Sequence, residues 1–158
     1  MTRQDTPHLP LLNRRSVILA GAAGLLSTAL PFPAIGEPED ADAAIREIFG
    51  DRPIRDGKVT VTLPPIAENG NSVAISVSVD SPMTERNHVR QIAIISPRNP
   101  LAEIARFQLG PRAGRAEVST RMRMAGTQTV RAIAEMSDGS LWRGTASTVV
   151  TLAACVIG

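Results

Sequence analysis

The chain has 158 residues, enough for one domain with extra segments, and its one Trp, three Phe and no Tyr require an aliphatic core. Residues 1–36 hold three of the 17 basic residues and one of the 15 acidic residues, so the remainder carries 14 of each. Without net positive charge that remainder lacks the electrostatic attraction that nucleic-acid binding needs, and this class of function is excluded.

Residues 1–36 have the pattern of an export signal. Arg14 and Arg15 lie in a polar segment, an apolar run follows at 17–30, and small residues at the end suit a signal peptidase. The run is shorter than the roughly 20 residues that span a bilayer. The paired arginines favour a twin-arginine signal, and an ordinary secretory signal with a chance arginine pair is the alternative. We expect a periplasmic protein that starts near Glu37, without a membrane segment after signal removal.

Residues 37–56 are predicted to form an acidic linker and one short amphipathic helix. In DADAAIREIFG, the apolar residues between Ala44 and Phe49 recur at helical spacing. Asp40 or Asp42 is the expected N-cap, and Gly50 suits the C-terminal stop. The helix is expected to pack on the domain or on a partner.

From residue 57 to residue 152 the apolar pattern changes to a period of two, which is the period of β-strands. In SVAISVSVD, for example, apolar residues from Val73 to Val79 alternate with mostly small polar ones. Turn sequences such as ENGN, SPRNP and SDGS separate seven such stretches. The predicted strands are 58–63, 72–80, 90–96, 103–109, 116–124, 128–136 and 142–152. Seven short strands without intervening helices predict an all-β fold, an antiparallel β-sandwich preceded by one short helix.

The sequence LPPIAENG lies between the first two predicted strands and contains Pro64 and Pro65. Proline has no backbone N–H group to donate to a neighbouring strand, so this segment is not expected inside a sheet. We predict that it forms an edge or crosses between sheets.

Beyond the signal, the chain has one histidine, His88, and one cysteine, Cys155. A zinc site usually needs four nitrogen or sulfur ligands, and blue copper needs two histidines beside its cysteine, so neither metal site can be assembled within this chain. His88 is interpreted as a surface or turn residue. Glu135 and Asp138 flank the EMSDGS turn and are interpreted as residues that support a hairpin. No GxSxG, P-loop or GxGxxG sequence occurs. An active site built into this chain is therefore not expected.

Cys155 lies three residues before the last residue of the sequence. In an oxidising compartment a lone cysteine is free, paired with another chain, or chemically loaded. The string LAAC resembles a lipobox, but a lipobox ends a signal peptide. Two interpretations are left: a small apolar residue that continues the last strand, or a thiol on a tether. Counted from Leu152, three extended residues give a reach of roughly 10 Å.

Four features cover most of the chain from about Ala43 onward: VTLPPIAENGNSVAISVSVDSP, SPRNPLAEIARFQL, AEVSTRMRMAGTQTVRAIAEMSDG, and a closing strand that leads to a near-terminal cysteine. Together they resemble the SoxY family, the sulfur-carrier subunits of the periplasmic thiosulfate-oxidising system. The resemblance implies an immunoglobulin-like β-sandwich over 57–152 and a C-terminal arm at 153–158. It also implies that Cys155 carries sulfur intermediates as sulfur-linked adducts.

The resemblance further implies partners and a division of labour. A SoxZ-type subunit forms a heterodimer with the carrier. A haem-bearing SoxAX attaches thiosulfate oxidatively, SoxB hydrolyses off sulfate, and in some organisms SoxCD oxidises the remaining sulfane. The carrier itself is implied to be neither an enzyme nor the holder of a cofactor.

The C-terminal arm departs from the family pattern. Family members typically end in GGCGG, whereas this chain ends in AACVIG. Alanine and β-branched residues stiffen and widen an arm that glycine keeps narrow and adaptable. The leading hypothesis is a periplasmic sulfur carrier loaded at Cys155. The alternatives are a non-carrier interaction module that binds a SoxZ-like partner, and a stand-alone thiol enzyme, for which a Cys–His pair would have no rigid support.

Overall fold

The computed structural model describes residues 38–154. Arg14 and Arg15 of the predicted signal lie outside the described residues, and so does Cys155. Within the described part, no helix is long and apolar enough to cross a bilayer.

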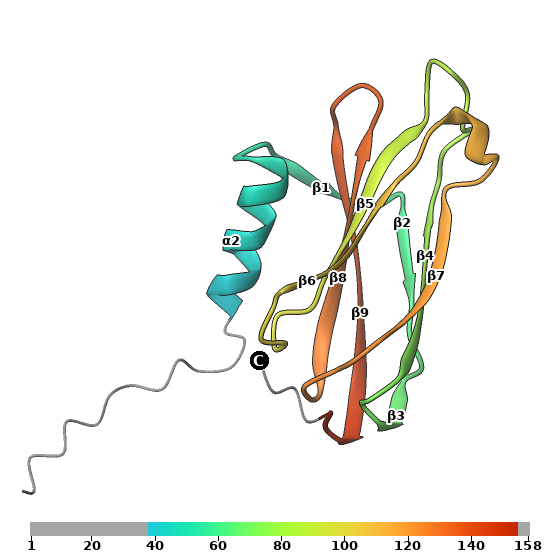
Figure 1. Cartoon of the computed structure of the whole chain (residues 1–158). Coiled ribbons are helices and arrows are strands. Elements are labelled where there is room, and N and C mark those ends of the chain that lie inside the picture. Colours follow the sequence, from blue (N-terminus) through green and yellow to red (C-terminus); the bar gives the residue numbers. More distant parts are fainter. Residues whose placement is uncertain (1–37, 155–158) are drawn as a thin grey trace, which may run out of the picture. The chain divides into compact units, whose positions relative to one another are not determined.

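Residues 38–154 form one α-helix and nine strands (Figure 1). The helix α2 spans Pro38–Phe49, and a 3-10 turn, η1, spans Pro111–Ala113. The strands are β1 (Ile54–Asp56), β2 (Val59–Thr62), β3 (Ile66–Asn69), β4 (Val73–Val79), β5 (Val89–Ile95), β6 (Glu103–Gln108), β7 (Glu117–Met122), β8 (Gln128–Met136) and β9 (Leu141–Leu152). All seven predicted strands are present, within two residues at each end.

The strands form two packed sheets. The larger sheet has the order β1-β9-β8-β5-β6, with β3 also paired to β9, and the smaller has the order β2-β4-β7. The β-sandwich is therefore confirmed, and its main pairs are antiparallel. Two short strands add parallel pairs: β1 pairs with the start of β9 and β3 with its end. Since β3 has a partner on one side only, the expected edge position of the segment after Pro65 is confirmed.

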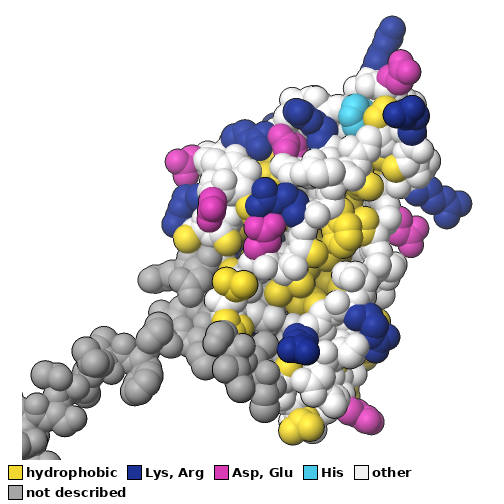
Figure 2. Space-filling view, viewed as in Figure 1, with side chains coloured by type: hydrophobic (Ala, Val, Ile, Leu, Met, Phe, Trp, Pro, Cys, Tyr) yellow, Lys and Arg dark blue, Asp and Glu magenta, His cyan; other side chains and the backbone are white. Residues whose placement is uncertain are grey.

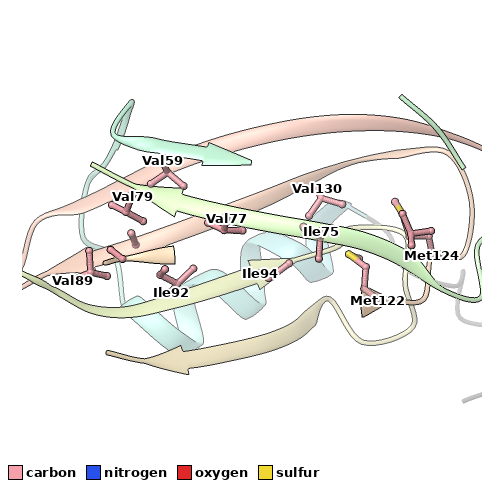
Figure 3. Packing of buried hydrophobic residues seen from close by; sticks show 14 of the residues in the cluster. Val59, Ile75, Val77, Val79, Val89, Ile92, Ile94, Met122, Met124 and Val130 are labelled. Carbon is pink, nitrogen blue, oxygen red and sulfur yellow. The ribbon is translucent and has the colours of Figure 1, made fainter. Parts of the chain in front are cut away.

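A core of aliphatic and methionine side chains fills the space between the sheets, as the scarcity of aromatic residues requires (Figure 3). Alternate residues of each strand contribute to it, because successive side chains of a strand point to opposite faces. The labelled members are Val59, Ile75, Val77, Val79, Val89, Ile92, Ile94, Met122, Met124 and Val130. Gly144 of β9 lies against the backbone of Val59, so even a Cβ atom at this position would overlap the carbonyl group of β2.

The helix α2 covers the outer face of the larger sheet, opposite the smaller sheet (Figure 1). Its buried side chains, Ala41, Ile45 and Phe49, pack against residues such as Ile95 and Ile133 of β5 and β8. Those two strands are therefore buried on both faces, and a second apolar cluster lies under the helix.

The predicted end of the helix is confirmed and its predicted start is wrong. Gly50 adopts a φ of +70°, and its amide donates to the Arg46 carbonyl at 2.7 Å, as expected of a helix stop. The helix begins at Pro38, before either expected N-cap, because proline is favoured in the first turn, where its missing N–H group is not needed. Asp42 instead forms an ion pair with Arg131 of β8 at 2.7 Å.

Glu135 connects β8 to the segment that follows the helix. Its carboxylate accepts hydrogen bonds from Arg52 Nη1 at 2.8 Å and from Gln91 Nε2 at 2.6 Å. Burial raises the pKa of this carboxyl, but the hydrogen bonds from Arg52 and Gln91 outweigh it, and the pKa lies below its usual value. Glu135 was interpreted as a hairpin residue beside the turn, but its carboxylate binds Arg52 and Gln91 on the sheet face under the helix instead.

This arrangement predicts acid sensitivity. A carboxyl whose folded pKa is depressed adds stability above its unfolded pKa, about 4.5, and that stability is lost as the pH falls through the folded value. Urea unfolding from pH 7 to pH 3 should show Glu135→Gln to be less stable at pH 7 and less sensitive to acid. Glu68→Gln, at an exposed position of β3, is the control and should follow the original chain. Parallel pH profiles for Glu135→Gln and the original chain would contradict this assignment.

Candidate functional site at the end of strand β9

Strand β9 leads the chain to the position of the predicted thiol. It pairs antiparallel with β8 from Leu141 to Thr148, and its last residues pair with β3. Its β-branched Thr and Val residues favour an extended strand. The strand ends at Leu152, as predicted, three residues before Cys155.

The second residue after β9, Ala154, is held in the fold, whereas Ala153 is exposed. Ala154 is 5% exposed, and its amide donates to the Met124 carbonyl at 3.0 Å. The Met124 amide in turn donates to the Gly70 carbonyl, and the Gly70 amide donates to the Leu152 carbonyl, both at 2.8 Å. The end of β9, the β3–β4 turn and the β7–β8 loop thus meet at one point, which we call the arm anchor (Gly70, Met124 and Ala154).

Gly70 has to be a glycine for the arm anchor to form. A Cβ atom on Gly70 would overlap the Met124 carbonyl oxygen and would lie 2.8 Å from the Ala154 nitrogen. Both are backbone atoms, so no side-chain rotation could relieve the contact. The turn sequence ENGN predicts a glycine turn but gives no sign that this glycine touches the end of the chain.

A buried polar cluster fixes the loop that carries Met124. Asn99 Nδ2 donates to the Arg123 carbonyl at 2.8 Å, and Asn99 Oδ1 accepts from the Ala125 amide at 3.1 Å, so one side chain holds both neighbours of Met124. Gln128 donates to the same Asn99 oxygen at 3.2 Å. Within the described residues every buried side-chain nitrogen or oxygen has a hydrogen-bond partner. Asn99 lies in the loop that directly follows β5, so these hydrogen bonds tie the Met124 loop to the end of β5. The buried polar side chains of the cluster all have hydrogen-bond partners, as is usual for buried polar groups.

The arm anchor shortens the expected reach of the thiol. Cys155 itself lies outside the described residues, but the residue before it is hydrogen-bonded and buried. The tether therefore starts at Ala154, and one residue adds roughly 3.5 Å rather than the 10 Å counted from Leu152. Any protein that reacts with this thiol has to approach the surface around the arm anchor closely.

The other candidate residues lie elsewhere. His88 is half-buried in the turn before β5, where its Nδ1 is 3.1 Å from the Thr84 carbonyl. The Met124 loop is tied to the opposite end of β5, roughly 20 Å away along a seven-residue strand. Asp138 accepts hydrogen bonds from the Ser140 amide and hydroxyl in the β8–β9 turn, which lowers its pKa and confirms its hairpin role. Between residues 38 and 154, no group of three His, Cys, Asp or Glu residues could hold a metal ion.

An apolar strip opens between the two sheets on the face shown in Figure 2. It lies between the edge strands β6 and β7, each of which has a strand partner on one side only. Half-buried Phe107, Leu109 and Val118 reach the surface there from the core. On the other side of β6, Leu101 is 78% exposed beside a groove of about 490 Å³ that α2 also lines. Edge strands flanked by apolar side chains are typical of a surface that another protein covers.

A comparison with family models matches residues 45–155 to the family described as sulfur oxidation protein SoxY. Among solved structures, the sulfur carrier protein SoxY from Chlorobium limicola f. thiosulfatophilum is 33% identical. The match covers 72% of this chain and 98% of that protein, with a TM-score of 0.62.

More distant structures share the fold alone. A superoxide reductase (neelaredoxin) from Ignicoccus hospitalis is 18% identical over 74% of this chain and 95% of its own, with a TM-score of 0.52. The superoxide reductase from Nanoarchaeum equitans is 13% identical over 60% of this chain and 99% of its own, with a TM-score of 0.50. No match was found among curated proteins.

Proposed function

The chain belongs to the SoxY family, and we propose that it carries sulfur intermediates of thiosulfate oxidation covalently on Cys155, without an active site of its own. One observation carries this proposal: the family match ends on residue 155, which is the only cysteine of the chain and directly follows the arm anchor. The longest described strand, β9, leads the chain toward this cysteine, which supports its proposed use as an attachment point.

The proposed chemistry uses the thiol as an attachment point. In the loading step, Cys–SH and thiosulfate give Cys–S–S–SO₃⁻, one proton and two electrons, and a haem-bearing SoxAX-like enzyme takes the electrons. In the next step, a SoxB-like enzyme adds water and releases sulfate and two protons, which leaves the persulfide Cys–S–S⁻. A SoxCD-like enzyme is the proposed oxidant of the remaining sulfane sulfur. The thiolate is the reactive form of a cysteine, so the enzyme of the loading step has to supply the environment that deprotonates Cys155.

Mass spectrometry of the intact protein tests this proposal. After incubation with thiosulfate and the oxidising partner enzyme, the chain should gain the mass of one S–SO₃ group, and Cys155→Ser should gain nothing. An unmodified chain, or equal adducts on Cys155→Ser, would contradict it.

We also propose a location and a permanent partner. The N-terminal pattern around Arg14 and Arg15 supports export to the periplasm by the twin-arginine route. The apolar strip between β6 and β7, together with Leu101, supports a heterodimer with a SoxZ-like subunit that covers β6. An apolar centre with charged residues at its rim, such as the Arg106–Glu103 ion pair at 2.8 Å, is the usual composition of such interfaces.

A charge at Leu101 should weaken this heterodimer. Leu101 is exposed, so Leu101→Glu should leave the fold intact and raise the dissociation constant for the SoxZ-like subunit by about tenfold or more. Thr62→Glu introduces the same charge at an exposed position of β2 and should bind normally. Isothermal titration calorimetry with the purified subunit measures the dissociation constants of both variants. If Leu101→Glu binds as tightly as Thr62→Glu, the interface lies elsewhere.

A further inference from the structure

The turn between β3 and β4 contains the dipeptide Asn69–Gly70. An asparagine deamidates most readily when glycine follows it, because glycine has no side chain to hinder attack by its own backbone nitrogen. Asn69 is the exposed last residue of β3, whereas Gly70 is buried in the arm anchor. The reactive dipeptide is therefore in direct contact with the end of β9, beside which β3 lies (Figure 1).

Deamidation of this dipeptide needs neither an enzyme nor an oxidant. The Gly70 nitrogen loses its proton to solvent and bonds to Asn69 Cγ, the Cγ–Nδ2 bond breaks, and ammonia leaves. Water then opens the resulting ring and gives aspartate or isoaspartate. In isoaspartate the main chain runs through Cβ and Cγ, so the backbone becomes longer by a carbon atom.

The fold holds both reacting groups away from the geometry that this reaction needs. The Gly70 amide donates to the Leu152 carbonyl at 2.8 Å. Asn69 Oδ1 accepts from the Asn71 amide at 2.8 Å, which fixes the carboxamide over the turn. Ring closure requires the peptide plane between Asn69 and Gly70 to rotate, because the Gly70 nitrogen has to face Asn69 Cγ instead of β9. The hydrogen bond to Leu152 therefore has to break before Asn69 can react.

The rest of the arm anchor blocks this rotation. The Gly70 carbonyl accepts from the Met124 amide at 2.8 Å. A Cβ atom on Gly70 would overlap the Met124 carbonyl oxygen and would lie 2.8 Å from the Ala154 nitrogen, so Gly70 has no room to turn while both segments are in place. The longer backbone of isoaspartate would displace Gly70 by more than this packing allows.

We infer that Asn69 is a deamidation site gated by the arm anchor. While the anchor is closed, Asn69 is protected. When the anchor opens, Asn69 converts to isoaspartate, and the anchor cannot close again around the lengthened backbone. The loss of ammonia makes the step irreversible, so the end of β9 stays released from Met124. The inference is independent of the proposed sulfur chemistry.

Peptide mapping of the full chain tests this inference. The chain is incubated in mildly alkaline buffer, with and without unfolding urea, and trypsin then releases the peptide 59–86, which contains Asn69. Fragment ions locate the conversion of amide to acid, and a sample digested at time zero gives the background. We expect Asn69 to deamidate about tenfold or more slowly in the folded chain than in the unfolded chain. Equal rates would overturn the inference.

Ala154→Pro distinguishes opening of the anchor from global unfolding. It removes the amide that donates to the Met124 carbonyl, and Asn69 should then deamidate about threefold or more faster than in the original chain. Ile133→Val weakens the core under α2 without touching the anchor and should deamidate as slowly as the original chain. Acceleration by both variants, or by neither, would contradict gating by the anchor.

The product provides a test that does not depend on the folding of Ala154→Pro. The isoaspartyl chain is separated from the original chain by chromatography, and hydrogen exchange is measured at the Ala154 amide. Exchange should be faster in the isoaspartyl chain, whereas Asn69→Asp, which carries the same charge on a normal backbone, should keep its protection. Equal protection in the two forms would show that the anchor tolerates isoaspartate and would overturn the inference.

Discussion

Replacing Cys155 by alanine is expected to abolish thiosulfate oxidation in cells that depend on this chain. The sequence contains no second cysteine, and no other side chain can form the S–S bond that the proposed loading step requires. The loss should be complete rather than partial, because no other residue could replace the attachment point. The measurement is sulfate production from thiosulfate by washed cells that express either form at equal protein level.

Two controls make the result specific. Cys155→Ser keeps nearly the same side-chain size and should be as inactive as Cys155→Ala, whereas His88→Ala should be active, because His88 lies at the far end of β5. The variants should still bind the SoxZ-like subunit, whose proposed site lies on β6. Normal sulfate production by Cys155→Ala would instead support the alternative of a non-carrier interaction module.

The second large effect is expected for Gly70→Ala. The added methyl group would overlap backbone atoms of Met124 and Ala154 and would also press on Val150, so the end of β9 has to move. Overpacking of this kind costs about 1–3 kcal/mol of unfolding free energy. The hydrogen bond from Ala154 to Met124 should break first, because it lies at the end of the strand.

Gly110→Ala is a matched control for Gly70→Ala. Gly110 has an extended backbone, with φ of −152°, and a Cβ atom there would meet no other atom within 4 Å. Urea unfolding and hydrogen exchange at the Ala154 amide measure the two effects. Gly70→Ala should unfold at lower urea and exchange Ala154 faster, while Gly110→Ala should match the original chain. Equal protection of Ala154 in both variants would contradict the arm anchor.

The sandwich could be predicted from the sequence because several strands place apolar residues at every second position, as from Val73 to Val79. The short parallel strands could not. Strand β1 has three residues, too few for a period to be visible, and it pairs with Leu141–Arg143 far along the chain. Local pattern carries no information on such a distant partner.

The position of the cysteine could be predicted from the sequence, but its surroundings could not. The arm anchor consists of backbone hydrogen bonds among segments more than 25 residues apart, and backbone groups are the same for every residue type. The side chain that holds Met124 belongs to Asn99, which reads in the sequence as one residue of the turn SPRNP. The role of Glu135 was likewise hidden, because its partner Arg52 lies 83 residues away.

The central claim, that Cys155 is the attachment point for sulfur, is tested most directly by locating the adduct within the chain. Trypsin cleaves after Arg143 and releases the C-terminal peptide 144–158, which contains the only cysteine. After incubation with thiosulfate and the oxidising partner enzyme, we predict that this peptide alone gains an S–SO₃ group, and that fragment ions place it on Cys155. An adduct on another peptide, or no adduct on a chain that still supports sulfate production, would contradict the account.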